Sequence, residues 1–336
     1  MAGCARDGCR GQSADRRSLG TSRTVNRLAE KLKVLLELVK FEHSVFALPY
    51  AYIGALYGAA SVTFAVPAIY PAPAPEATPW VTLGGWPTLS ALVWITVAMV
   101  GARAFAFVLN RAIDKEIDAR NPRTAGRAIP AGLIKAWELW LFAAFMLAAY
   151  LHAVFRLEPL THMLWPIPLA AFLAYPYMKR FTPLCHYWLG LCLGLAPVAG
   201  WVAVGGSISA VAPWVLGGAV MLWTAGFDMI YATQDVECDV RDGVHSMPAD
   251  LGVSAALMQT RTTHVLTVVL LAVGGLLADA GWVWFLGVGV AAALLWYENT
   301  IVSATDLSRV NAAFFTVNGV IAMIVFAGAL GDRLLG

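Results

Sequence analysis

Charged residues are scarce in this chain. Of its 336 residues, 13% are charged and 59% are hydrophobic, and the mean hydropathy is +0.68. Soluble globular domains have a charged share of about 25%, so this class is excluded and the lipid bilayer is the expected medium. The formal net charge is only +2, and we expect no nucleic-acid partner.

Cysteine and histidine are also few. Of the five cysteines, Cys4 and Cys9 lie in a polar tail, Cys185 and Cys192 in an apolar stretch and Cys238 among acidic residues. This is not the pattern of a disulfide framework, and we expect unpaired thiols. The six histidines show no spacing typical of a transition-metal site.

Long apolar stretches make up most of the remaining sequence. Segments of roughly 17 to 25 apolar residues are long enough to cross a bilayer as helices. About nine such segments occur, centred near Ile53, Thr96, Phe145, Ala170, Cys192, Ala219, Val269, Val290 and Val320. We therefore expect an all-α integral membrane protein, a bundle of about nine transmembrane helices.

Basic residues are distributed unevenly between the loops. They precede the first apolar stretch, follow the second and recur in later alternate loops, whereas the opposite loops contain only Arg156, with Arg333 at the far terminus. The positive-inside rule then places the N-terminus in the cytoplasm. We expect a multi-pass protein of the inner (cytoplasmic) membrane, with the C-terminus outside.

Three segments outside the core of the spans differ in composition. Residues 1–24 have no periodicity and are expected to form a disordered tail, so the transmembrane domain is assigned to 25–336. Residues 25–41 carry apolar residues at helical spacing, which predicts an amphipathic helix at the cytoplasmic surface. Residues 65–80 are rich in proline and are expected to form an outer loop without chemistry. No apolar core occurs within 1–25, so we expect the first span, not a signal peptide, to direct insertion.

Acidic residues concentrate in two segments, 110–118 and 228–242, at the predicted cytoplasmic ends of apolar helices. At intervals of three, four or seven the segments contain Asn110, Asp114 and Asp118, and then Asp228, Asp235, Asp239 and Asp242. Such intervals bring side chains onto one helix face, where several carboxylates stay together only if a cation joins them. Their oxygen atoms suit Mg²⁺, which takes one or two protein carboxylates together with substrate phosphates. The alternative for the first segment alone is a solvated helix end, and the second, independent acidic segment favours the functional interpretation.

Basic side chains flank both acidic segments. The candidates for substrate binding are Arg103, Arg123, Arg127, Lys179 and Arg180. A guanidinium group offers a planar fork to phosphate, so acids that hold a metal between such groups suit a diphosphate. Lys179 and Arg180 are equally well explained as membrane anchors, whereas Arg103 lies within a span and needs an internal partner.

These segments resemble the motifs of the UbiA superfamily of intramembrane prenyltransferases. The resemblance is carried by NRAIDKEID from Asn110, by the following RTAGRAIPAG, by YPYMKR and by FDMIYATQDVECD. The opening LVKFEHSVFALPYAYIGAL is similar to the first span of the branch that acts on aromatic acids. The resemblance implies a nine-helix bundle whose cytoplasmic mouth binds a Mg²⁺-polyprenyl diphosphate, with the isoprenoid tail in a chamber open to lipid. Arg111 departs from the pattern, because many members have Asp there.

The resemblance also implies roles for individual residues. Asn110, Asp114 and Asp118 would hold one Mg²⁺, and Asp235 and Asp239 the other. The basic positions of the family correspond to Arg123, Arg127, Lys179 and Arg180. Asp228 lies deeper and would take or orient the phenolic proton of the acceptor, although a structural acid is the alternative. His43 could contact the acceptor or serve as a structural histidine.

We therefore expect an enzyme that transfers a polyprenyl group from its diphosphate to an aromatic acid acceptor in ubiquinone or menaquinone biosynthesis. 4-Hydroxybenzoate is the first choice of acceptor. A dihydroxynaphthoate, or another acceptor of the superfamily, is the alternative within the same chemistry. A secondary transporter with ion-coupled acids is the alternative from another class, although transporters place such sites near the middle of the membrane.

Overall fold

The computed structural model describes residues 34, 46–64 and 81–335. The expected tail, the proline-rich loop, His43 and all of the expected amphipathic helix except residue 34 lie outside these residues. Within them the elements are α2 (Leu48–Phe64), β1 (Thr82–Leu83), β2 (Trp86–Pro87), α3 (Leu89–Ile113), α4 (Lys115–Arg120), α5 (Ala136–Val154), α6 (Thr161–Leu164), α7 (Pro166–Met178), α8 (Cys185–Ala203), α9 (Val211–Ala232), α10 (Val236–Asp242), α11 (Met247–Leu251), α12 (Val253–Leu277), α13 (Trp282–Ile301), η2 (Ala312–Val317) and α14 (Asn318–Leu335).

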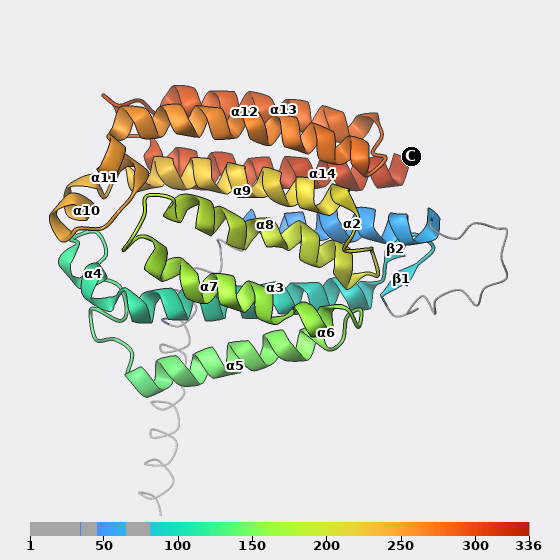
Figure 1. Cartoon of the computed structure of the whole chain (residues 1–336), viewed down its shortest axis with the longest axis horizontal. Helices are drawn as coiled ribbons and strands as arrows, with labels where there is room; N and C mark the ends of the chain where they lie inside the picture. The colour runs from blue at the N-terminus through green and yellow to red at the C-terminus, as the bar shows by residue number, and fades with distance from the viewer. Residues whose placement is uncertain (1–33, 35–45, 65–80, 336) are drawn as a thin grey trace, which may run out of the picture.

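The long helices run roughly parallel or antiparallel to one another in a bundle (Figure 1). Short helices α4, α10 and α11 lie together at one end, and the small antiparallel hairpin β1–β2 lies at the other end near the C-terminus. Helix α8 packs against α2 and α9, α9 packs against α12, and α3 packs against α5. The connections that carry the acidic motifs are therefore gathered at a single end of the bundle.

Six helical segments are long and apolar enough to cross a membrane: α3, α5, α8, α9, α12 and the continuous segment Ala312–Leu335. Helices α2, α7 and α13 occupy the other three predicted positions. Helix α7 has 13 residues, which correspond to about 20 Å, and α6 precedes it directly. The expectation of an all-helical membrane protein is confirmed, and the count of nine spans stays a prediction.

Large apolar side chains face outward on the bundle, as a lipid environment requires. Trp137, Leu141 and Phe145 of α5 are each more than 60% exposed, and so are Met258 of α12 and Trp296 of α13. An apolar surface of this extent is unfavourable in water. The exposed faces are consequently the surfaces expected to contact acyl chains.

Helices α2 and α8 approach so closely that only glycine fits at their contact. A Cβ atom at Gly54 would overlap the carbonyl of Pro197, and one at Gly200 would overlap the carbonyl of Ala51. Small residues permit such backbone contact between membrane helices, where it supports close van der Waals packing. This contact fixes α8, which carries several residues of the cavity described below.

Each acidic segment is divided between two helices, at Asp114 in the first and at Asp235 in the second, so the expectation of one continuous helix face is wrong. Asp114 ends α3 and precedes α4, and Asp235 follows a turn after α9 and precedes α10. At the second bend the backbone bonds tighten, since the Asp235 amide donates to the carbonyl of Ala232. Like charges four residues apart on one helix destabilise it, and the bends let the carboxylates reach separate cationic partners.

Candidate active site

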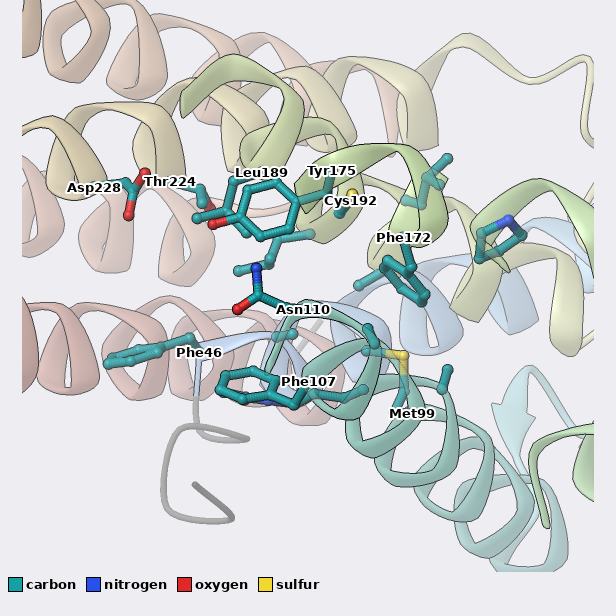
Figure 2. A pocket seen from close by; sticks show the side chains of 18 of the residues that line it. Phe46, Met99, Phe107, Asn110, Phe172, Tyr175, Leu189, Cys192, Thr224 and Asp228 are labelled. Carbon is teal, nitrogen blue, oxygen red and sulfur yellow. The ribbon is translucent and has the colours of Figure 1, made fainter. Parts of the chain in front are cut away.

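A cavity of about 510 Å³ opens among helices α2, α3 and α5 to α9, beside η2. Its wall is charged at the end of the bundle where α4 and α10 lie, and apolar farther in. Figure 2 shows the apolar wall, with Phe46, Met99, Phe107 and Phe172 around the space. The cavity suits a ligand with an anionic head and a hydrophobic body, because it offers polar groups at one end and hydrocarbon at the other.

Asp114 lies at the charged end and is 2% exposed. Its carboxylate pairs with Nζ of Lys179 at 2.7 Å and with a guanidinium nitrogen of Arg180 at 3.4 Å, and it accepts a hydrogen bond from Nδ2 of Asn110 at 3.0 Å. Arg180 also donates to the carbonyl of Ile113 at 3.0 Å. The basic pair that ends α7 therefore contacts the first acidic motif directly. Asn110, Asp114 and Lys179 line the cavity.

Asp118, on α4, is also buried and has two cationic partners. Arg127 donates to one carboxylate oxygen at 2.6 Å, and Arg111 lies 3.5 Å from the other. The guanidinium group of Arg111 is 5.9 Å from the ring centre of Phe107. Arg111, which departs from the family pattern, therefore belongs to the cavity wall and balances an acid of the motif.

Asp235 pairs with Arg123 from the loop after α4. Nε of Arg123 donates to Oδ1 of Asp235 at 2.9 Å, and a second nitrogen of the same guanidinium contacts Oδ2. Nδ2 of Asn121 donates to the same Oδ1 at 2.8 Å, and the hydroxyl of Tyr231 accepts a bond from Arg123 at 2.7 Å. The loop 121–127 thus joins the two acidic motifs, which are more than a hundred residues apart in the sequence.

Asp239 and Asp242, both on α10, have different surroundings. Oδ2 of Asp239 accepts a hydrogen bond from Oγ of Ser246 at 3.0 Å, and burial raises the pKa of Asp239 to about 6. Asp242 pairs with Arg241 and lies near Arg120 instead. Asp239 lines the cavity, whereas Asp242 is not among the lining residues.

Asp228 lies within α9, farther from the charged end of the cavity than Asp235. Its Oδ2 is 2.7 Å from Nδ1 of His186 on α8, and Nε2 of His186 accepts a hydrogen bond from the backbone amide of Met247 at 3.1 Å. Figure 2 shows Asp228 and Thr224 on one side of the space, with Asn110 and Tyr175 pointing toward one another across it. Both charged and aromatic groups therefore lie within the same part of the cavity.

Arg103 lines the cavity from α3, in the apolar part of the wall. Its guanidinium lies 4.9 Å from the ring centre of Phe107, and its buried Nε has no hydrogen-bond partner among the described residues. The internal partner that the sequence required for Arg103 is therefore the aromatic ring of Phe107. A buried donor without an acceptor is costly, and an anionic ligand in the cavity would satisfy it.

The structure brings most of the predicted residues to this cavity. The lining residues among them are Arg103, Asn110, Asp114, Asp118, Arg123, Arg127, Lys179, Asp228, Asp235 and Asp239. Arg180 is absent from the lining but pairs with Asp114. Sequence reasoning missed Asn121, Tyr231, His186 and Ser246. Tyr231 stood within the quoted FDMIYATQDVECD segment, whereas His186 has no spacing that connects it to either motif. Tyr175 stood within the quoted YPYMKR segment and could have been found there.

The donor atoms fit a hard divalent cation, since they are carboxylate and amide oxygens. Across residues 46–64 and 81–335, no three acidic, histidine or cysteine side chains are gathered closely enough to hold a metal. Asp114, Asp118 and Asp235 each contact a lysine or arginine. Oxygen ligands for a metal are present, but they are engaged with protein cations.

The fold and the site together define a multi-pass membrane protein whose cavity joins a charged mouth to an apolar interior. Residues 76–320 match the family model described as the UbiA prenyltransferase family. The chain belongs to the UbiA prenyltransferase family, and it is a prenyl-transferring enzyme.

Several proteins named 4-hydroxybenzoate octaprenyltransferase are similar to the chain. One from Alkalilimnicola ehrlichii is 31% identical over 258 residues, which cover 76% of this chain and 87% of the relative. One from Xanthomonas oryzae pv. oryzae is 33% identical over 252 residues, which cover 74% and 82%. The similarity therefore extends over most of both chains.

Two solved structures have the same fold. A UbiA homolog from Aeropyrum pernix K1, in its apo form, has a TM-score of 0.72 at 32% identity and covers 87% of this chain and 98% of its own. A UbiA homolog from Archaeoglobus fulgidus bound to GPP and Mg²⁺ has a TM-score of 0.65 at 20% identity, with coverage of 90% and 99%. At that lower identity the likeness supports the fold alone.

Proposed function

We propose that this enzyme transfers a polyprenyl group from a polyprenyl diphosphate to 4-hydroxybenzoate, with Mg²⁺, in quinone biosynthesis. The observation that carries the proposal is the cavity that joins five aspartates, three of them paired with lysine or arginine, to an apolar interior. The names of the similar proteins support 4-hydroxybenzoate over a dihydroxynaphthoate, which remains the alternative acceptor. Family membership favours this enzyme over the ion-coupled transporter.

The diphosphate head of the donor belongs at the charged end of the cavity. Asn110, Asp114 and Asp118 would hold one Mg²⁺, and Asp235 and Asp239 a second. Bound there, Mg²⁺ supplies positive charge that stabilises the leaving diphosphate. The lysine and arginine groups that now pair with the aspartates are then available to the diphosphate oxygens, and Arg123 and Arg127 offer the bidentate geometry that phosphate prefers.

The isoprenoid tail belongs in the apolar part of the cavity. Burial of each CH₂ group contributes about 0.8 kcal/mol, so a long tail supplies most of the donor's binding energy. Water is excluded from the same wall, which protects an allylic cation from hydrolysis. The aromatic side chains Phe46, Phe107 and Phe172 line this space.

The aromatic acid would bind between the donor and the deeper part of the wall. Arg103, whose Nε has no partner among the described residues, is suited to the carboxylate of the acid. Asp228 would accept the phenolic proton, and the electron pair of that O–H bond would pass into the ring. A ring carbon then bonds to the allylic carbon while the carbon–oxygen bond to diphosphate breaks, with its electron pair leaving on the diphosphate. Loss of the hydrogen from the alkylated carbon and reprotonation of the oxygen restore the phenol.

We place the charged end of the bundle at the cytoplasmic face of the inner membrane. The positive-inside distribution of lysine and arginine supports a cytoplasmic N-terminus, and α2, α7 and α13 would cross the bilayer beside the six apolar segments to give nine spans. Residues 25–336 then form the transmembrane domain behind the tail 1–24. Both acidic motifs thereby meet the aqueous phase that supplies Mg²⁺ and the aromatic acid.

A membrane assay tests the proposal directly. Membranes that contain the protein are incubated with radiolabelled polyprenyl diphosphate, Mg²⁺ and 4-hydroxybenzoate or a dihydroxynaphthoate, and the lipid products are separated. A labelled prenylated 4-hydroxybenzoate is expected, and membranes that carry an Asp114→Ala variant are the control. The absence of a labelled product with every aromatic acid would refute the proposal.

A further inference from the structure

His186 is a buried side chain on α8 that no spacing in the sequence connects to the acidic motifs. It is 2% exposed, yet its ring reaches the edge of the cavity and lies 2.7 Å from Oδ2 of Asp228. No other hydrogen bond to this carboxylate occurs among the residues that the structure describes. The orientation of Asp228 therefore depends on the position of one imidazole ring.

The hydrogen bonds of His186 determine which of its nitrogens carries the proton. Nε2 accepts a bond from the backbone N–H of Met247 at 3.1 Å, and an amide N–H can only donate. Nε2 must then be unprotonated, so the proton lies on Nδ1 and is donated to Asp228. A doubly protonated ring would set two N–H donors against each other at Met247. The geometry selects a neutral imidazole that stabilises a carboxylate.

The amide of Met247 is itself held at the start of α11, beside the second acidic motif. Oγ of Ser246 caps this helix by accepting a bond from the amide of Ala249 at 3.4 Å, and it donates to Asp239 at 3.0 Å. Adjacent residues of one turn thus contact Asp239 on one side and His186 on the other. This turn therefore fixes the position of the His186 imidazole relative to the second acidic motif.

We infer that His186 is a positioning residue for Asp228. In this role it orients the carboxylate toward the cavity and, as a neutral Nδ1–H donor, keeps it in the charged form that accepts the phenolic proton. This inference rests on the proposed function, in which Asp228 acts as the base. His186 itself would contact neither substrate, so its effect on turnover passes through Asp228 alone.

Two substitutions separate this role from simple packing. His186→Leu fills the space but removes both hydrogen bonds. His186→Gln is expected to keep both hydrogen bonds, since its amide oxygen can accept from the Met247 amide and its NH₂ group can donate to Asp228. Tyr187→Phe is the matched control on the same helix, because it removes the hydrogen bond between Gln259 and the Tyr187 hydroxyl without altering the lining of the cavity.

The assay measures kcat and KM for both substrates with radiolabelled donor, and measures donor binding separately in the presence of Mg²⁺. His186→Leu is expected to lower kcat by about 10- to 100-fold, by analogy with residues that orient metal ligands through a hydrogen bond, with donor binding unchanged. His186→Gln should restore most of the turnover. A ring-fluorinated 4-hydroxybenzoate that keeps the reacting carbon free has a more acidic phenol and depends less on a base. The loss of kcat in His186→Leu, relative to the wild type, should therefore be smaller with this acceptor.

Two results would overturn the inference: wild-type kcat in His186→Leu, or equal losses in both variants that are the same for both acceptors. Histidine ¹⁵N NMR of the wild-type protein is a second test that needs no folded leucine variant, with the His186 signals assigned by their loss in His186→Gln. A neutral ring protonated at Nδ1 is expected, and an imidazolium or a proton on Nε2 would contradict it. A wild-type protein that binds the donor but gives no product would instead overturn the proposed function, and the inference with it.

Discussion

Asp235 and Asp242 lie seven residues apart in the same acidic segment, and the structure predicts opposite results when each is replaced by asparagine. Asp235→Asn keeps the shape of the side chain but removes the charge that pairs with Arg123. Interactions with charged groups contribute about 1.5–3 kcal/mol each. Loss of one such interaction, that with the metal, gives about 1.5–3 kcal/mol, which corresponds to a loss of about 10- to 100-fold in kcat/KM.

The same substitution should have little effect on stability. The side chain of Arg123 is 32% exposed and that of Asp235 is 15% exposed, so their ion pair is partly screened by water. Pairs of this kind contribute at most about 1 kcal/mol to the free energy of unfolding. Thermal unfolding in detergent should therefore occur close to the wild-type temperature, which separates a loss of catalysis from a loss of fold.

Asp242→Asn is the matched control for this experiment. Asp242 pairs with Arg241, outside the lining of the cavity, and its replacement should leave kcat/KM near that of the wild type. The assay is the initial rate of labelled lipid formation over a series of Mg²⁺ and donor concentrations. If Asp235→Asn kept more than about a tenth of the wild-type kcat/KM, or if Asp242→Asn lost as much, the assignment of Asp235 to the metal site would be wrong.

Three further predictions follow from the cavity and the bundle. Arg103→Ala should raise KM for the aromatic acid by about 10- to 100-fold through the loss of one charge-assisted contact and leave donor KM unchanged in steady-state kinetics; a selective rise in donor KM would contradict this. Gly200→Val should lower the unfolding temperature because its Cβ meets the Ala51 carbonyl, whereas Gly289→Ala, with open space around it, should not; equal unfolding temperatures would refute the packing argument. Chelation of divalent cations with EDTA should abolish product formation and added Mg²⁺ should restore it, and activity that survives EDTA would exclude the metal-bound donor.

The spacing of apolar and acidic residues was enough to predict the all-helical fold and the two motifs, because both depend on local helical periodicity. Asp114 and Asp235 were singled out in this way, and the arginines after the first motif were singled out by their position beside it. The same periodicity could not show that the helix is interrupted at each of these aspartates, nor that their cationic partners Lys179 and Arg123 come from distant parts of the chain. It also grouped Asp242 with the others, although the structure turns it toward Arg241.

The residues that the sequence could not provide reach the site through tertiary packing. His186 approaches Asp228 because α8 packs against α9, and the two residues are 42 positions apart. Asn121 reaches Asp235 across 114 positions through a loop with no periodicity of its own. Contacts of this kind become visible only when the helices are assembled.

The bends at Asp114 and Asp235 also have a mechanical consequence. They separate α4 and α10 from the long helices, which are fixed by close contacts such as those between α2 and α8. Asp118 and Asp239 therefore lie on short helices beyond each bend, whereas Asn110 and Asp228 lie on the long helices of the bundle. An exchange of partners at Asp118 or Asp239 is therefore expected to move a short helix and to leave the apolar wall of the cavity, which the long helices form, unchanged.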